Sequence, residues 1–256
     1  MLIRIEIEPD GYITVTDDCR EAAKALERQE AVIGLRPEES WNQSPEPAQS
    51  WSGVSYYITD LEALEDTWYV REAYYRFHGK PLVIASNERF VLREMTAEDA
   101  EGIADLYRDS MSCRFCPLPG KNIKEIKEKI QSYIQYVYGC YGCGMWVMEE
   151  PGTGKIIGRV GIEPETQEMP DGRVSGFFLG YLIAKGYRRK YLAEEACRIA
   201  ISFAWNRLWL DRLYCKISEQ NAPSIALAKK LGFQKADRQL YVLQNKNSEQ
   251  EAVLED

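Results

Sequence analysis

Short apolar runs alternate with amphipathic stretches over the first third of the chain. The run YITVT has the composition of a strand, and the following CREAAKALERQ has the spacing of a helix. Asp17 or Asp18 can cap that helix, because a carboxylate accepts hydrogen bonds from its free N–H groups. Further strands are expected at 31–35, 54–58 and 81–85, and a second helix at about 63–78. Such alternation needs crossovers, so residues 1–86 are predicted to form a small, Rossmann-like α/β domain with a parallel sheet.

The pattern changes at residue 87, and residues 87–256 are predicted to form a second domain. Its first strand, RFVLREM, precedes a helix that Thr96 can cap, with Asp99 where a capping box usually has Glu or Gln. Later elements are expected in this order: a helix at about 122–138, strands at 144–150, 155–163 and 174–184, a helix at about 189–208, a strand at 212–218, a helix at 224–231 and a strand at 239–244. The helix at 189–208 gathers its apolar residues on one face: Leu192, Ala196, Ile199, Ala200 and Phe203.

The turn GYRRKYLAEEA (186–196) joins a predicted strand to a predicted helix and carries three cations. A helix N-terminus exposes unpaired N–H groups and a partial positive charge, so it attracts anions. Arg188, Arg189 and Lys190 oppose the helix dipole by about 0.3–1 kcal/mol each, which favours a pyrophosphate ligand over a solvated charge run. Tyr191 stands where glycine would let a phosphate approach the backbone, and its side chain can cross the site or point outward.

Three motifs and the order of the elements resemble those of the GNAT superfamily of N-acetyltransferases. Arg188-x-x-Tyr191-x-Ala193 is similar to the coenzyme A motif of that family, which has glycine at the position of Tyr191. NAPSIALAKKLGF is similar to a downstream motif, and RFVLREMTAEDAEGIADLYRD to the start of the bacterial branch that is similar to ribosomal-protein acetyltransferases. The resemblance covers residues 87–244. It implies an α/β (α+β) fold with a mixed, mostly antiparallel central sheet flanked by helices, preceded by the added domain.

The resemblance also implies acetyl-CoA as the co-substrate and suggests its binding residues. Backbone groups around Leu182 and Ile183 would pair with the pantetheine arm, and Asn221 would contact the same arm. Asn221 can also cap the helix that begins near Ser224, and the two roles are compatible. The pyrophosphate would lie on the turn and the helix start, at Arg188, Arg189, Lys190, Tyr191, Leu192 and Ala193.

Acetyl transfer to an amine needs a base for the attacking nitrogen, donors for the developing oxyanion and a proton for the leaving thiolate. Glu163 is the candidate base, directly or through water; the alternative is a solvated charge at a strand end. Two residues depart from the family pattern. Phe178 stands where relatives often carry an acidic residue, and Ala228 where many carry the tyrosine that protonates the thiolate. Catalysis would then rest mainly on proximity, with water carrying the proton.

Composition argues against several classes of partner. The formal net charge of −8 argues against a general nucleic-acid binder and favours a cationic acceptor. No apolar run approaches the roughly 20 residues of a membrane-spanning helix, and the first residues are too charged for a signal peptide. The expected location is the cytoplasm, where the seven cysteines would be reduced thiols or ligands rather than disulfides.

Four cysteines have the spacing of a zinc site: Cys113, Cys116, Cys140 and Cys143. A predicted helix of about 17 residues separates the two pairs by roughly 25 Å, whereas zinc binds all four sulfurs at about 2.3 Å. Packing is therefore the favoured interpretation, and no metal is expected.

The leading hypothesis is an acetyl-CoA-dependent N-acetyltransferase that acts on a small-molecule amine or a protein N-terminus, as a monomer or homodimer. The acceptor is expected beside residues 110–121 and the hairpin 163–174, with candidate lining residues Tyr133, Tyr136, Tyr138 and Trp146. The same aromatic residues can belong to the core instead. Two other hypotheses remain open: a non-catalytic acyl-CoA-binding regulatory module, and an interaction protein stabilised by metal at the four cysteines.

Overall fold

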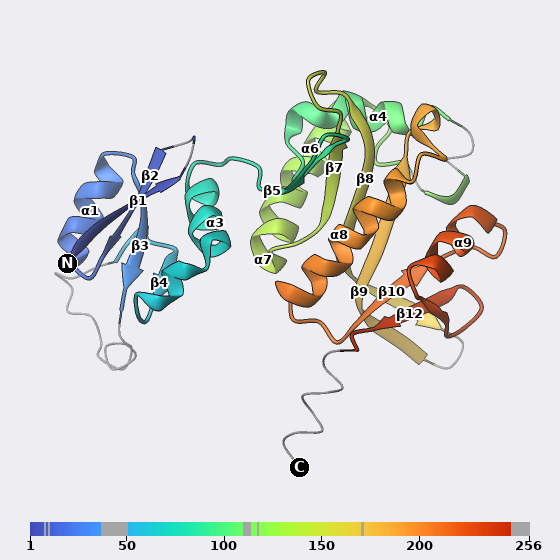
Figure 1. The fold of residues 1–256 in the computed structure, drawn as a ribbon. Coiled ribbons are helices and arrows are strands. Elements are labelled where there is room, and N and C mark those ends of the chain that lie inside the picture. Colours follow the sequence, from blue (N-terminus) through green and yellow to red (C-terminus); the bar gives the residue numbers. More distant parts are fainter. Residues whose placement is uncertain are drawn as a thin grey trace, which may run out of the picture. The chain divides into compact units, whose positions relative to one another are not determined.

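The computed structural model describes residues 1–7, 9, 11–36, 51–109, 114–116, 118–169 and 172–246 (Figure 1). The chain divides into two compact units, Met1–Leu82 and Val83–Asp256. The sequence pattern placed this boundary after residue 86. The difference arises at strand β5 (Val83–Ser86), because it pairs with β6 (Val91–Arg93) in the sheet of the second unit.

The first unit is built on a four-stranded sheet in the order β1-β2-β3-β4. Its elements are β1 (Leu2–Ile7), β2 (Gly11–Thr16), α1 (Cys19–Glu27), β3 (Ala31–Leu35), β4 (Tyr56–Ile58), η1 (Glu62–Glu65) and α3 (Thr67–Phe77). β2, β3 and β4 run parallel as predicted, but the sheet is not purely parallel, because β1 pairs antiparallel with β2. β1 was not among the predicted strands, although Arg4 and Glu6 alternate with its isoleucines as in a strand with one exposed face.

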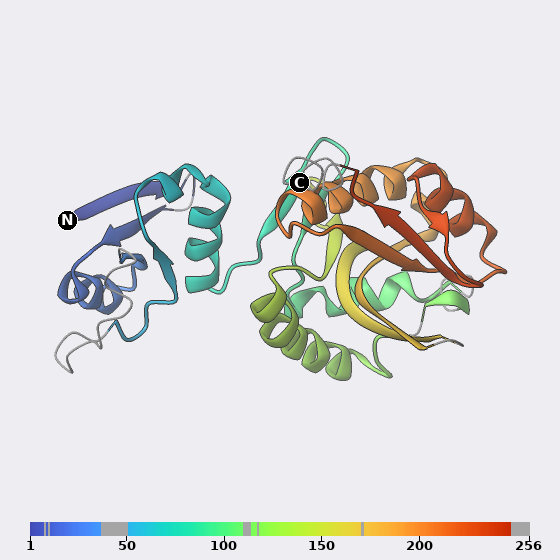
Figure 2. The same cartoon turned by 90° about the horizontal axis from the view of Figure 1, so that it is seen from below.

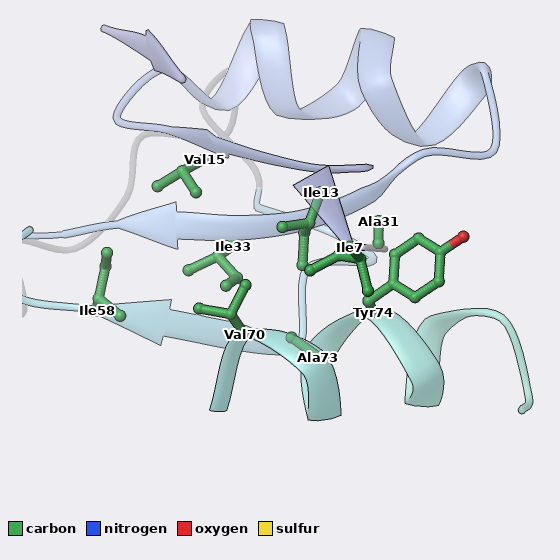
Figure 3. Packing of buried hydrophobic residues seen from close by; sticks show 9 residues of the cluster. All are labelled: Ile7, Ile13, Val15, Ala31, Ile33, Ile58, Val70, Ala73 and Tyr74. Atoms are coloured by element: carbon green, nitrogen blue, oxygen red, sulfur yellow. The ribbon is translucent and has the colours of Figure 1, made fainter. Parts of the chain in front are cut away.

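Helices cover both faces of this first sheet. One apolar cluster joins the strands to α3 (Figure 3): Ile7, Ile13, Val15, Ala31, Ile33, Ile58, Val70, Ala73 and Tyr74. A smaller cluster, which includes Ala22 and Ala25 of α1 and Val32 of β3, closes the other face. Of the two acidic residues predicted to cap α1, Asp18 does so, because its carboxylate accepts the Arg20 N–H at 2.8 Å.

The second unit is built on an eight-stranded sheet in the order β11-β12-β10-β9-β8-β7-β6-β5. Its further strands are β7 (Met145–Glu149), β8 (Ile156–Met169), β9 (Gly172–Ile183), β10 (Arg212–Lys216), β11 (Gln234–Lys235) and β12 (Leu240–Gln244). Its helical segments are η2 (Ala97–Asp99), α4 (Ala100–Leu106), α6 (Ile123–Tyr133), η3 (Ile134–Tyr138), α7 (Gly139–Tyr141), η4 (Lys185–Tyr187), α8 (Leu192–Asn206) and α9 (Ala222–Lys230). β9 and β10 run parallel, and the other paired strands run antiparallel. This is the mixed, mostly antiparallel sheet that was predicted.

Two details of the second unit differ from the sequence pattern, and a third confirms it. The helix expected at 122–138 is α6 followed by a π-helical turn, η3, and the short α7. β11 was not predicted, because its two residues are both exposed and carry no apolar alternation. The predicted capping box is confirmed, since the Asp99 carboxylate accepts the Thr96 N–H at 2.7 Å.

Helices α8 and α6 lie on opposite faces of the second sheet (Figure 2). On the α8 face, the fully buried Trp146 meets Phe203 edge-on, with ring centroids 5.1 Å apart. On the other face, Tyr133 of α6 reaches Glu163 of β8. The predicted apolar face of α8 is buried except at Ile199, which is half-buried. Within the described residues, none of the helices is long and apolar enough to cross a membrane.

Candidate active site

β9 and β10 meet at one point of the described sheet and are not paired beyond it. They pair at Phe178 and Tyr214, whose rings stack with centroids 5.3 Å apart. The Ala184 N–H bonds a carbonyl of β8, and antiparallel ladders alternate, so the backbone groups of Tyr181 and Ile183 point toward the β10 side. The C-terminal part of β9 therefore presents an edge of backbone donors and acceptors that β10 does not use.

The backbone N–H and carbonyl groups of Leu182 point to the opposite side of β9 from those of Ile183. These are the two residues predicted to meet the pantetheine arm. By the same alternation, Leu182 directs its N–H and carbonyl toward Arg159 of β8, whereas those of Ile183 lie on the unpaired edge. The Ile183 carbonyl accepts a hydrogen bond from Arg188 Nε at 3.0 Å, which leaves its N–H for another partner. Tyr181, which sequence reasoning did not single out, offers the second set of backbone groups on this edge.

The turn between β9 and α8 contains two non-glycine residues in the left-handed region. Arg189 has a φ of 60° and Tyr191 a φ of 63°. No side chain caps α8, and the Glu195 N–H bonds back to the Tyr191 carbonyl as the helix begins. The N–H groups of Leu192 and Ala193 have no acceptor within the helix, so they can donate to an anion at this end.

The three cations of the turn have different surroundings. Arg188 donates to the Asp109 carboxylate at 2.7 Å, and together with its bond to the β9 carbonyl this ion pair holds the turn in place. Arg189 and Lys190 are exposed, and the Lys190 ammonium lies 5.1 Å from the centroid of the Tyr187 ring. Two of the cations are therefore placed to meet an incoming anion, while the third stabilises the backbone that receives it.

Tyr191 points outward from the turn. The residue is 72% exposed, and the Lys230 ammonium lies 5.0 Å from the centroid of the tyrosine ring. Lys230 in turn pairs with Glu194 of α8 at 2.5 Å. The ring is therefore exposed to solvent and lies beside the ammonium of Lys230 from α9.

We expect Tyr191→Gly to raise the free energy of unfolding by about 0.5–1 kcal/mol. Glycine adopts a φ of 63° without the Cβ clash, although its greater freedom in the unfolded chain cancels part of the gain. Urea denaturation of the full chain measures the change. Trp209→Gly is the control, because Trp209 has a φ of 47° and is 83% exposed. A loss of stability in Tyr191→Gly alone would mean that the contact with Lys230 outweighs the backbone strain.

Asn221 stands at the N-terminus of α9 and caps it. Its side-chain oxygen accepts the Ser224 N–H at 3.3 Å, which is the capping role that the sequence allowed. The cap uses only the amide oxygen, so the amide NH2 group can donate to a ligand as well. Ala228, about two turns further along α9, is buried and carries no group that can donate a proton.

Glu163 lies on β8, half-buried and directly opposite Phe178 of β9. Tyr133 donates a hydrogen bond to Glu163 Oε1 at 2.5 Å. Burial, and after it the negative charge of Glu163, raises the pKa of Tyr133 well above its ordinary value. The Tyr133 hydroxyl therefore stays protonated at neutral pH and remains a donor to the carboxylate.

The aromatic residues predicted beside the acceptor lie in different environments. Trp146 is fully buried on the α8 face, which is the core alternative that the sequence left open; strand alternation turns it away from the face of Glu163. Tyr138 is buried and Tyr136 is 62% exposed. Of these aromatic side chains, Tyr133 is the one that contacts Glu163.

The four-cysteine pattern is only partly described, because Cys113 lies outside the described residues. Cys116 is half-buried, Cys140 is exposed and Cys143 is buried. Burial raises the pKa of Cys143 to about 12, so this side chain is a neutral thiol at physiological pH. Within the described part of the chain, no three His, Cys, Asp or Glu side chains form a group that could hold a metal ion.

Sequence relatives of the second unit carry acetyltransferase names. A family model for the acetyltransferase (GNAT) domain matches residues 89–234, more than half of the chain. The uncharacterized N-acetyltransferase p20 of Bacillus licheniformis is 28% identical over 150 residues, which cover 58% of this chain and 80% of the relative. The uncharacterized N-acetyltransferase YoaA of Bacillus subtilis is 29% identical over 155 residues, which cover 59% of this chain and 83% of the relative.

Solved structures have the same fold. An acetyltransferase from Agrobacterium tumefaciens superimposes with a TM-score of 0.51 at 21% identity, covering 63% of this chain and 94% of its own. A GNAT-family acetyltransferase from Bacillus anthracis does so with a TM-score of 0.51 at 15% identity, covering 64% and 98%. The family match begins beyond the first unit, which ends at Leu82. The chain belongs to the GNAT family of acetyltransferases.

Proposed function

We propose that this chain transfers the acetyl group of acetyl-CoA to the amine of a small molecule or of a protein N-terminus. GNAT acetyltransferases use acetyl-CoA as co-substrate and act on amines. One observation supports the proposal most strongly: the unpaired edge of β9 leads directly to an uncapped helix N-terminus, with Glu163 on the adjacent strand. The phosphates of the coenzyme would need the helix N-terminus, its extended arm the strand edge, and its reactive end a nearby base.

The pantetheine arm would lie along the unpaired edge of β9. The backbone groups of Tyr181 and Ile183 would bond the amides of the arm, in the way that an added strand bonds a sheet edge. Leu182 would contribute to the wall beside the arm rather than through its backbone. The amide NH2 group of Asn221 would donate to a carbonyl of the arm from the α9 side.

The pyrophosphate would lie on the N-terminus of α8. The N–H groups of Leu192 and Ala193 would donate to its oxygens, and the partial positive charge of the helix end adds to the attraction. Arg189 and Lys190 would contribute exposed positive charge. Arg188 would act through the ion pair that fixes the turn.

Glu163 would act as the general base. In the transfer, the amine nitrogen forms a bond to the thioester carbonyl carbon, the bond from that carbon to sulfur breaks, and the amine proton passes to Glu163, directly or through water. The thiolate takes a proton from water, because Ala228 offers none. N–H groups on the unpaired edge of β9 would polarise the carbonyl oxygen.

The position of Glu163 compensates for a departure from the family pattern. Relatives often carry an acidic residue at the position of Phe178, and Glu163 is the cross-strand partner of that position. Directly opposed residues of antiparallel strands have Cβ atoms about 4.5–5.5 Å apart. A carboxylate on β8 would therefore stand within one side-chain length of the place where relatives carry theirs.

A non-catalytic acyl-CoA-binding module is the second candidate. The apolar Phe178 and Ala228 favour it, because two positions that often carry proton-transfer groups in relatives have none here.

Release of free thiol from acetyl-CoA in the presence of peptides with free N-termini, polyamines or amino sugars separates the two candidates. An acetyltransferase releases thiol in proportion to one class of amine, and mass spectrometry then shows the acetylated amine. A binding module is stabilised against heat by coenzyme A but releases no thiol with any of the amines. A chain that shows neither response contradicts both proposals.

A further inference from the structure

Two tyrosines of the α6–η3 segment hold both backbone groups of Met145. The Met145 N–H donates to Tyr133 Oη at 2.7 Å, and Tyr138 Oη donates to the Met145 carbonyl at 2.5 Å. Tyr138 also accepts the Met95 N–H at 3.1 Å. Both rings are packed edge to face, with centroids 5.2 Å apart. The first residue of β7 is therefore fixed from the α6 side by a pair of buried hydroxyls.

The π-helical turn η3 makes this arrangement possible. Tyr133 and Tyr138 are five residues apart, and on an α-helix such residues point about 140° away from each other. In a π-helical turn the backbone hydrogen bonds join residues five apart, which brings these two side chains closer to the same side of the helix. Gly144 provides the room, because a Cβ there would lie 2.6 Å from the Tyr138 ring and 2.8 Å from Tyr133 Oη.

The hydrogen bonds around Tyr133 determine which group receives its hydroxyl hydrogen. A phenol has a single O–H hydrogen, and its oxygen here already accepts the Met145 N–H. The hydrogen is therefore donated to Glu163 Oε1, at 2.5 Å. This bond engages one of the two carboxylate oxygens of Glu163. An N–H of the sheet, a buried hydroxyl and the carboxylate thus form one chain of hydrogen bonds.

We infer that Tyr133 is a positioning residue for acetyl transfer: its hydroxyl holds the carboxylate of Glu163 in place. The inference rests on the proposed function, in which Glu163 is the base. A base must lie within hydrogen-bond reach of the proton it accepts, so loss of this bond should slow the chemical step and leave the binding of acetyl-CoA unchanged. A purely structural tyrosine would not separate these two effects.

The test compares Tyr133→Phe with Tyr138→Phe, using the amine that the wild type acetylates fastest. Both variants remove a buried hydroxyl that bonds Met145, so both are expected to unfold at lower temperature. Tyr133→Phe should lower kcat about tenfold, while the KM for acetyl-CoA stays within about twofold of wild type. Tyr138→Phe should leave both kcat and this KM within about twofold of wild type, because its hydroxyl bonds Met145 and not Glu163.

4-Fluorophenylalanine at residue 133 provides a second measurement if Tyr133→Phe does not fold. Its fluorine fills the place of the hydroxyl but cannot donate a hydrogen bond to Glu163, so kcat should fall as in Tyr133→Phe. An active wild type whose kcat is unchanged in either variant overturns the role of Tyr133 and leaves the proposed function intact. A wild type that acetylates no amine overturns the proposed function itself, and with it the role of Tyr133.

Discussion

Glu163→Gln is expected to lower kcat for acetyl transfer by about 100-fold or more, with the KM for acetyl-CoA within about twofold of wild type. Glutamine keeps the shape of the side chain and an oxygen that can accept the Tyr133 hydroxyl, but it cannot take up the amine proton. A factor of 100 corresponds to about 2.7 kcal/mol of transition-state stabilisation. Steady-state kinetics at the pH optimum of the wild type measure the change.

Glu165→Gln is the matched control for this substitution. Glu165 lies two residues further along β8, on the same side of the strand, and is exposed. Its removal changes the net charge by the same amount, yet kcat should remain within about twofold of wild type. If Glu163→Gln retained more than half of the wild-type rate, Glu163 would be a hydrogen-bond partner of Tyr133 and not the general base.

Gly161→Ala is expected to destabilise the second unit by about 3 kcal/mol and to abolish most of the activity. Gly161 pairs with Met145 in the β7–β8 ladder. A Cβ at residue 161 would overlap the Gly144 carbonyl oxygen and lie 2.6 Å from the Met145 Cα, and both neighbours are backbone atoms that cannot rotate away. The strands would have to separate here. Glu163 lies only two residues further along β8 and would be displaced with them. Denaturation of the full chain, followed by hydrogen exchange in β7 and β8, measures the loss.

Gly180→Ala is the matched control for Gly161→Ala. Gly180 is the cross-strand partner of Gly161 on β9, so it has the same residue type in the same row of the sheet. The nearest atom to a Cβ at residue 180 is Met145 Sδ at 3.2 Å, at the flexible end of a side chain. The expected cost is below about 1 kcal/mol. Equal losses in the two variants would contradict the assignment of the clash to the backbone.

Local signals in the sequence were sufficient for the elements on which the coenzyme is proposed to bind. The turn before α8, the apolar face of that helix and the cap at Asn221 each depend on residues close together in the chain, so spacing and capping chemistry reveal them. The mixed sheet and the family follow from the order of these elements. The left-handed conformation of Tyr191 also fits, since its position is the one where the family motif has glycine.

The acceptor side depends on long-range pairing, which the sequence pattern did not reveal. Trp146 was left open between the acceptor region and the core, because the apolar β7 is buried on both sides and its alternation carries no signal. Tyr181 was missed because ladder alternation, and not residue type, decides which backbone groups of β9 are unpaired. The meeting of Tyr133 and Tyr138 at Met145 involves a π-helical turn, and a one-residue change of helical period is not visible in a pattern of apolar positions.

Amide hydrogen exchange of the full chain, with and without coenzyme A, tests the central claim most directly. The claim places the coenzyme on the unpaired edge of β9 and on the N-terminus of α8, so exchange should slow at Ile183, Leu192 and Ala193 and around Asn221. The amides of the first unit, Met1–Leu82, should exchange at the same rates in both samples. Protection that leaves Leu192 and Ala193 unchanged, or that falls in the first unit, would contradict the account.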